Sequence, residues 1–164
     1  MTTITNRTYD ELEIGESCER VHTISEDDLQ MFAAVSGDHN PLHLNAEYAA
    51  TTPFKQQIAH GMYSGALISA TFAMELPGPG TIYMGQNIQF KRPIFIGDTI
   101  TVILTVKEKR DRKKEVIFDT TIKNQNGKVV VAGEATVIAP TEKVTVSLSN
   151  LPTIQLGNHA YDAE

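Results

Sequence analysis

The most apolar segment of the chain, residues 62–76, reads MYSGALISATFAMEL. Its apolar residues lie around most of a helical wheel, which is typical of a helix that the rest of the protein buries. Small residues such as Gly65 and Ala66 would let this helix fit tightly inside a sheet. It is too short, and with Glu75 too polar, to span a membrane. The sequence Pro77-Gly78-Pro79-Gly80 then ends the helix.

The chain after this helix changes to alternating apolar and polar residues, which predicts strands. The predicted strands are Thr81–Phe90, Thr99–Lys109, Glu115–Lys123 and Lys128–Ile138. Asn126-Gly127 is a strong hairpin turn, and the short links favour antiparallel pairing. Helices followed by an antiparallel sheet define the α+β class. We therefore expect the sheet to curl around the 62–76 helix and so bury the apolar surfaces of both.

The chain before this helix predicts one strand-like lead and two shorter helices. The lead falls within residues 9–24. Ser25 is a helix N-cap with Asp28 three residues later, which is a weak capping box, and Gly37 ends the helix that they begin. Residues 46–51 predict a second short helix that closes before Pro53.

Composition indicates one globular domain that spans residues 1–164. The chain has 41% hydrophobic and 21% charged residues, as is ordinary for a soluble protein of 164 residues. A net charge of −6 argues against a general nucleic-acid binder. Cys18 is the single cysteine, so neither an intrachain disulfide nor a cysteine metal site is expected. The first twenty residues show no secretory signal, which makes the cytoplasm the expected location.

Residues 36–43, which read SGDHNPLH, are the main candidate for chemistry. Gly37 and the Asn40-Pro41 pair favour a rigid bend instead of regular structure. Such a bend can aim Asp38 and His43 at one point, such as a water molecule. Two groups that each accept or donate a proton on one water are what adding water to a double bond, or removing it, requires.

The start of the 62–76 helix is the second candidate. A helix that begins near Gly61 presents N–H groups without intrahelical partners and the positive end of its dipole. Such N–H groups can stabilise a carbonyl oxygen that gains negative charge during a reaction. A hydroxyl further along this helix could assist a catalytic group, and spacing alone leaves both Ser64 and Ser69 open.

Other chemistries find less support in the sequence. No Gly-x-Ser-x-Gly elbow and no phosphate-binding glycine loop occur. The five histidines lack metal-ligand spacing, so we expect no metal. Basic residues could still bind phosphates on this acidic chain, either at Lys91-Arg92 or in the segment from Lys107 to Lys114, which holds six basic residues. A solvated hairpin tip is the favoured interpretation of that segment, because long charged side chains normally lie in water.

Several motifs together resemble a known family. The sequence DHNPLH at residues 38–43 is followed by His60-Gly61-Met62, and the likeness continues through residues 85–86, 90–93 and 97–98. These motifs resemble the signature of the MaoC-like, (R)-specific enoyl-CoA hydratases, over about residues 10–139. Residues 140–164 extend past this core as a C-terminal extension.

The resemblance implies a hot-dog fold, in which an antiparallel sheet wraps a long central helix, and a homodimer. It implies reversible syn hydration of trans-2-enoyl-CoA to (R)-3-hydroxyacyl-CoA, with coenzyme A as part of the substrate and no separate cofactor. The family's catalytic pair falls on Asp38 and His43, its oxyanion-hole glycine on Gly61 and its assisting serine on Ser69. We take Asn40, His60, Lys91 and Arg92 as further candidates for binding the substrate.

Three alternatives remain open at this point. The chain could dehydrate 3-hydroxyacyl thioesters on a carrier protein, or hydrolyse acyl-CoA as a hot-dog thioesterase. It could also be a non-catalytic acyl-binding module, because a fold does not fix a function. Fatty-acid oxidation and the supply of hydroxyacyl units for polyester storage are both compatible with a hydratase.

Overall fold

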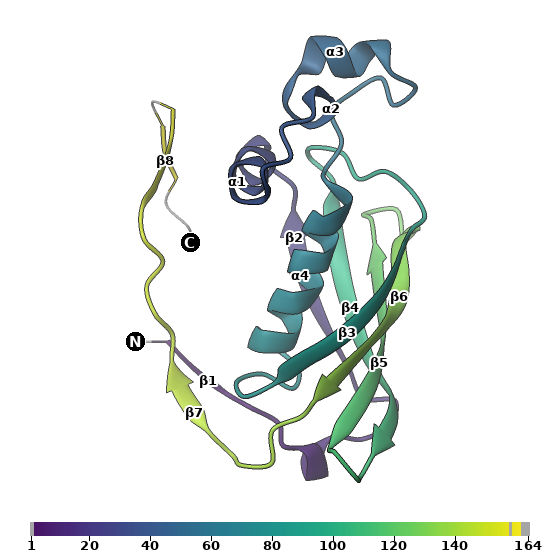
Figure 1. Cartoon of the computed structure of the whole chain (residues 1–164), viewed down its shortest axis with the longest axis vertical. Helices are drawn as coiled ribbons and strands as arrows, with labels where there is room; N and C mark the ends of the chain where they lie inside the picture. Colours follow the sequence, from purple (N-terminus) through teal and green to yellow (C-terminus); the bar gives the residue numbers. More distant parts are fainter. Residues whose placement is uncertain (1, 158, 162–164) are drawn as a thin grey trace.

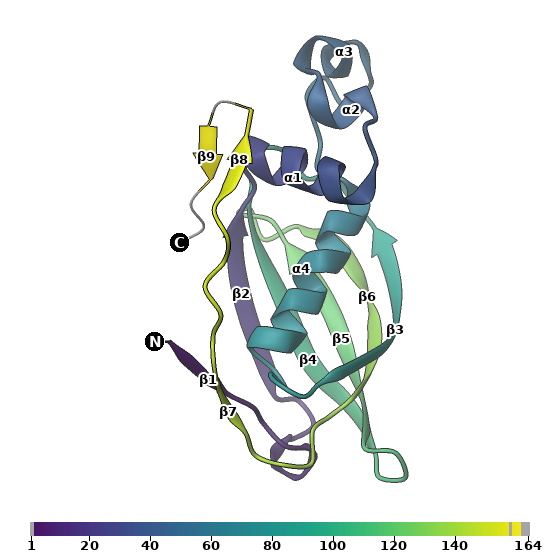
Figure 2. The ribbon, with the colours of Figure 1, turned by 60° about the vertical axis from the view of Figure 1, so that its left-hand side comes forward.

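The computed structural model describes residues 2–157 and the backbone of residues 159–161. Its centre is helix α4 (Gly61–Met74), which lies along the concave side of a five-stranded antiparallel sheet (Figures 1 and 2). The predicted α+β arrangement, a sheet curled around this helix, is confirmed. Within the described residues, none of the helices is both long and apolar enough to cross a membrane.

The sheet has the strand order β2-β4-β5-β6-β3, so that β2 and β3 form its two edges. The bounds are Ser17–Thr23 for β2, Ile82–Phe90 for β3, Thr99–Arg110 for β4, Glu115–Lys123 for β5 and Val129–Ile138 for β6. These strands match the predictions to within one residue at each end for β3 to β6. The sequence did not predict that β3 pairs with β6 instead of with β4, the next strand along the chain.

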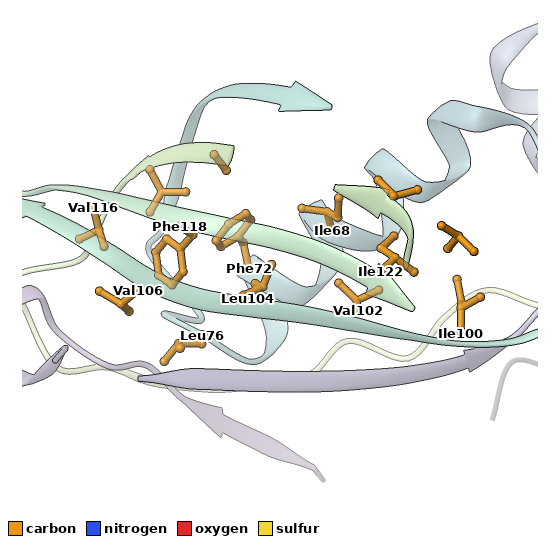
Figure 3. Close-up of a cluster of buried hydrophobic side chains, with 14 of the residues drawn as sticks. Ile68, Phe72, Leu76, Ile100, Val102, Leu104, Val106, Val116, Phe118 and Ile122 are labelled. Carbon is orange, nitrogen blue, oxygen red and sulfur yellow. The ribbon is translucent and has the colours of Figure 1, made fainter. Parts of the chain in front are cut away.

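The core forms where α4 meets the sheet. Ile68 and Phe72 of α4 are fully buried against side chains of β4 and β5 (Figure 3). The Phe72 and Phe118 rings meet edge to face with centroids 5.0 Å apart. Because β4 alternates buried and partly exposed residues, one of its faces supplies the core and the other faces outward.

One face of α4 is not buried, and here the sequence prediction was wrong. Exposed residues recur at intervals of four, three and four along the helix, which places them on a single face: Met62, Ala66, Ser69 and Ala73. When apolar residues lie all around a helix, the sequence pattern does not indicate which of its faces the sheet will cover.

The chain ends run beside each other along one side of the molecule (Figure 2). Strand β1 (Thr3–Thr5) pairs with β7 (Thr145–Ser147), and β8 (Ile154–Leu156) pairs with β9 (His159–Tyr161). A one-turn helix, η1 (Tyr9–Glu11), follows β1. The buried Asn6 side chain donates to the carbonyls of Pro79 and Glu142, at 3.0 and 2.9 Å, and accepts from the Val144 N–H at 3.0 Å. These bonds fix the start of the C-terminal extension to the body of the fold.

Three helices cover the end of the sheet near the start of α4 (Figure 2). Helix α1 (Glu26–Ser36) begins with the predicted capping box between Ser25 and Asp28 and ends at Gly37, which has the left-handed φ of 77°. Helix α3 (Ala46–Thr51) has the predicted bounds. The four-residue helix α2 (Pro41–Leu44) was not predicted, because only a bend was expected there.

Asp28 ties β2 to the start of α1 and gives a prediction for acid stability. Burial alone would raise the pKa of the Asp28 carboxyl, but hydrogen bonds from His22, the Ser25 N–H and Tyr63 outweigh burial and lower this pKa to about 2. The native carboxyl therefore takes up its proton at lower pH than the unfolded one. The stabilisation, about 2 kcal/mol, is present above about pH 4 and is lost as the pH falls toward 2.

Urea unfolding of the wild type and Asp28→Asn between about pH 2 and pH 6 tests this expectation. The wild-type free energy of unfolding should fall more steeply with acid than that of Asp28→Asn. Asp27→Asn changes the neighbouring, less buried carboxylate and should keep the wild-type slope. Equal slopes in all three proteins would contradict the expectation.

Candidate active site

A tight bend between α1 and α2 positions Asp38. The Asp38 Oδ1 atom accepts the Asn40 N–H at 3.2 Å, and the Asn40 Oδ1 atom accepts the Leu42 N–H at 3.0 Å. Asn40 is therefore the N-cap of α2, and Pro41 occupies the first turn, where its missing N–H is tolerated. These bonds give the Asn40 carboxamide a structural role and bring the two ends of the 38–43 segment together.

His43 lies on α2 and is buried beside Asp38. Its Nδ1–H donates to the Ile58 carbonyl at 2.7 Å, which leaves Nε2 as the acceptor of the neutral ring. Nε2 lies 3.8 Å from Asp38 Oδ2, and the exposed fractions of the two side chains are 10% for His43 and 52% for Asp38. This separation is too long for a hydrogen bond but lets one water molecule donate to both atoms. The predicted convergence of Asp38 and His43 is thus present.

His60 packs directly on this pair. Its ring stacks on His43 with centroids 3.8 Å apart and planes at 25°, and its Nε2–H donates to the Asp38 carbonyl at 3.0 Å. The side chain is only 3% exposed, and Nδ1 has no hydrogen-bond partner among the described residues. Burial lowers the pKa of His60, and the nearby His43 lowers it further, although the bond to Asp38 opposes both effects.

A cavity of about 330 Å³ adjoins these histidines and is mostly apolar. His43, His60, Gly61 and Ser64 line one side of it. The remaining lining residues come from the α3–α4 loop, from β6 and from the end of β3 and the segment that follows it: Phe54, Ile58, Ala59, Phe90, Lys91, Arg92, Pro93, Ile94 and Val131. Lys91 and Arg92 therefore border the cavity, as their candidacy for substrate binding requires.

Gly61 is the first residue of α4, with His60 as N-cap. Its N–H consequently has no acceptor within the helix, and it stands at the positive end of the helix dipole. A Cβ atom on Gly61 would lie 3.0 Å from Phe90 Cζ, so the absence of a side chain allows this aromatic ring to approach. The sequence pointed to Gly61, but it gave no signal for Phe54 or Phe90 as cavity residues.

The two serines of α4 differ in position. Ser64 is buried and lines the cavity, whereas Ser69 is exposed on the open face of α4 and is not among the lining residues. The structure of one chain thus brings Ser64, and not Ser69, to the cavity with Gly61. The resemblance assigns a role to Ser69 by its place in a motif, which does not reveal which way a residue faces.

The basic cluster at residues 107–114 lies at the β4–β5 hairpin, at the far end of the sheet from α2 and α3 (Figure 1). Much of its charge is paired locally. Lys107 binds Asp119 and Glu134, and Arg110 binds Glu108. The cluster therefore does not adjoin the cavity, and the solvated hairpin tip is the better description.

Asp38, His43 and His60 are also the residue types that bind metal ions, and one ligand atom of each lies within 4.8 Å of the others. The stacking of the two imidazoles argues against a shared ion. Lone pairs lie in the ring planes, and nearly parallel planes 3.8 Å apart direct them side by side instead of at one point. The arrangement suits a water molecule between His43 and Asp38.

Comparison with known proteins identifies the family of this chain. The family described as MaoC like domain matches residues 11–128. An (R)-specific enoyl-CoA hydratase of Rhodospirillum rubrum is 48% identical over 80% of this chain and 91% of its own length. One from Aeromonas caviae is 40% identical over 79% of this chain and 96% of its own.

A solved structure shares nearly the whole fold, including most of the C-terminal extension. The unliganded R-hydratase PhaJ1 from Pseudomonas aeruginosa is 55% identical, with a TM-score of 0.92 over 95% of this chain and all of that one. The family match covers well over half of the chain, and the curated relatives are matched along most of their own length. The chain belongs to the MaoC-like dehydratase family.

Proposed function

We propose that this chain is an (R)-specific enoyl-CoA hydratase, a hydro-lyase that reversibly adds water to trans-2-enoyl-CoA. The observation that carries the proposal is the 3.8 Å separation of His43 Nε2 and Asp38 Oδ2, beside a cavity that His43 and Gly61 line. This reaction needs two components: a pair of side chains that can accept a proton from the water, and a backbone N–H that donates to the thioester oxygen. The relatives from R. rubrum and A. caviae carry the same activity in their names.

The hydrogen bonds suggest how protons move in the reaction. One water donates its two hydrogens to Asp38 Oδ2 and His43 Nε2. As the water oxygen bonds to C3, one of these groups takes a proton, and the C2–C3 electron pair moves toward the thioester oxygen, where the Gly61 N–H donates. The same group returns the proton to C2 and restores the carbonyl. Because the group that takes the proton from the water also returns it, both parts of the water add from the side on which the water is held, and the hydration is syn.

The test is turnover of crotonyl-CoA in two parallel assays. We expect the absorbance of the conjugated enoyl thioester to fall without release of free thiol, and chiral analysis to give (R)-3-hydroxybutyryl-CoA. Thiol release would favour a thioesterase, and tight binding without turnover a non-catalytic module. An acyl-carrier-protein thioester belongs in the same series, since a mitochondrial carrier-protein dehydratase of Arabidopsis thaliana is 35% identical over 79% of this chain.

We further propose that two copies of the chain form the working enzyme. Strand β3 is an edge of the sheet, and an unpaired edge favours pairing with another strand. Ile82 and Met84 of this strand are more than half exposed, and this chain also leaves one face of α4 uncovered. Ser69 lies in that open face, so its assisting role requires the second copy. The cytoplasmic location stays a prediction.

Sedimentation tests the dimer. The wild type should sediment at twice the 18.0 kDa of one chain, and Met84→Asp should shift it toward the monomer. Val35→Asp places the same charge on another exposed apolar residue, on α1, and should leave the mass unchanged. A wild-type mass of a single chain at micromolar concentration would refute the dimer.

A further inference from the structure

We infer that His60 is a positioning residue for the Asp38–His43 pair, and that it does not bind the substrate. The His60 side chain contacts both Asp38 and His43, and His60 directly precedes Gly61 in the chain. Its Nε2–H holds the Asp38 backbone carbonyl at 3.0 Å, and its ring face supports His43 at 3.8 Å. The inference rests on the proposed hydration for its kinetic test, but its structural test is independent of that function.

The contacts around His60 leave its ring little freedom. Phe32 of α1 packs on it with ring centroids 5.0 Å apart, and His43 covers a face of the imidazole. The titratable groups that face it are His43 of α2 and Asp38 of the preceding bend. Because Asp38 is half exposed and belongs to a short segment, its carbonyl needs an anchor in the protein interior, and the Nε2–H supplies one.

The unpartnered Nδ1 atom supports this role. A neutral imidazole has one donor and one acceptor, so a ring that donates through Nε2 has an unprotonated Nδ1, which can only accept a hydrogen bond. Buried polar atoms normally have partners, and leaving one without a partner lowers stability. An apolar ring at this position would avoid the cost of the unpartnered Nδ1. The imidazole differs from such a ring by its Nε2–H, and this donor holds the Asp38 carbonyl.

Two substitutions separate the contacts. His60→Phe keeps an aromatic ring for His43 but loses the donor to Asp38, whereas His60→Gln keeps an amide donor near the Nε2 position but loses the ring. We expect each to lower kcat about ten- to hundredfold with KM changed less than about threefold, because misplaced groups slow the chemical step without weakening binding. His39→Phe, at the exposed neighbour of Asp38, is the matched control and should keep wild-type kcat.

Thermal unfolding distinguishes positioning from a structural role. The melting temperature of His60→Phe should stay close to that of the wild type, because the removal of the unpartnered Nδ1 offsets the loss of the hydrogen bond to the Asp38 carbonyl. Reduced kcat in an equally stable protein supports the inference. A rise in KM at constant kcat would restore a substrate-binding role. A kcat within about twofold of wild type, or activity and melting temperature that fall together, would overturn the inference.

Nitrogen NMR of the histidine rings gives the readout that does not depend on activity. In the wild type, His60 should be the neutral Nε2–H tautomer at about pH 8, and because its pKa is lowered by burial it should gain its proton at a lower pH than an ordinary histidine does. A wild type that does not hydrate enoyl-CoA would refute the proposed function but not this result. An Nδ1–H tautomer, or ordinary protonation near pH 6.5, would refute the inferred role of His60.

Discussion

Asp38→Asn and His43→Asn are each expected to reduce kcat for crotonyl-CoA hydration by about a hundred- to ten-thousandfold. Asp38→Asn keeps an Oδ1 atom for the Asn40 N–H, so the bend should persist while the carboxylate is lost. His43→Asn offers an amide N–H near the position of Nδ1, which can still donate to the Ile58 carbonyl, but it removes Nε2. Initial rates with crotonyl-CoA, together with melting temperatures, give the comparison.

The double variant sharpens this test. If both groups act on one water, then removing the second should cost little more than removing the first, because residues that act as a unit are strongly non-additive. His39→Asn changes the exposed histidine between them and should leave kcat unchanged. Either single variant with a rate within about fivefold of wild type would contradict the proposed mechanism.

The local elements of the fold could be predicted from the sequence because local physics determines them. The Ser25–Asp28 capping box, the left-handed Gly37 and the alternation along β4 and β5 each depend on residues close in the chain. The pairing of β3 with β6 could not be predicted in this way, because the choice of partner between strands distant in the chain depends on the packing of the whole domain. The open face of α4 could not be predicted for a similar reason. Hydropathy does not distinguish residues that the chain's own sheet buries from residues that something else covers.

The candidate site divides along the same line. Asp38, His43 and Gly61 converge because each belongs to a short motif with its own turn or helix start. Their contacts come from elsewhere in the chain: the Ile58 carbonyl fixes the His43 tautomer, and Phe90 reaches Gly61 from the end of β3, a contact that the 90–93 motif does not reveal. The sequence indicated His60 as a candidate for substrate binding, but only the structure shows that its ring stacks on His43.

Gly61→Pro is expected to lower kcat about a hundred- to thousandfold, the effect of removing one oxyanion donor. Proline replaces the hydrogen of this N–H with its ring carbon Cδ and adds a Cβ atom. Gly61 is the first residue of α4, where proline is favoured, and His60 before it has φ −58° and ψ 134°, which suits a residue that precedes proline. The helix should therefore form normally, and KM should change little, since negative charge develops on the thioester oxygen only in the transition state.

Gly61→Ala is the control that isolates this N–H. Both substitutions add a Cβ atom 3.0 Å from Phe90 Cζ, and the half-exposed Phe90 side chain can shift to admit it. Alanine keeps the N–H, so any loss that it shares with proline reflects crowding by the Cβ atom, and the remaining difference reflects the replacement of the N–H donor by the proline Cδ. Rates with crotonyl-CoA, alongside inhibition by the saturated butyryl-CoA, measure both. If proline and alanine lower kcat equally, the Gly61 amide does not stabilise the enolate oxygen, and that charge must be met by another donor in the cavity.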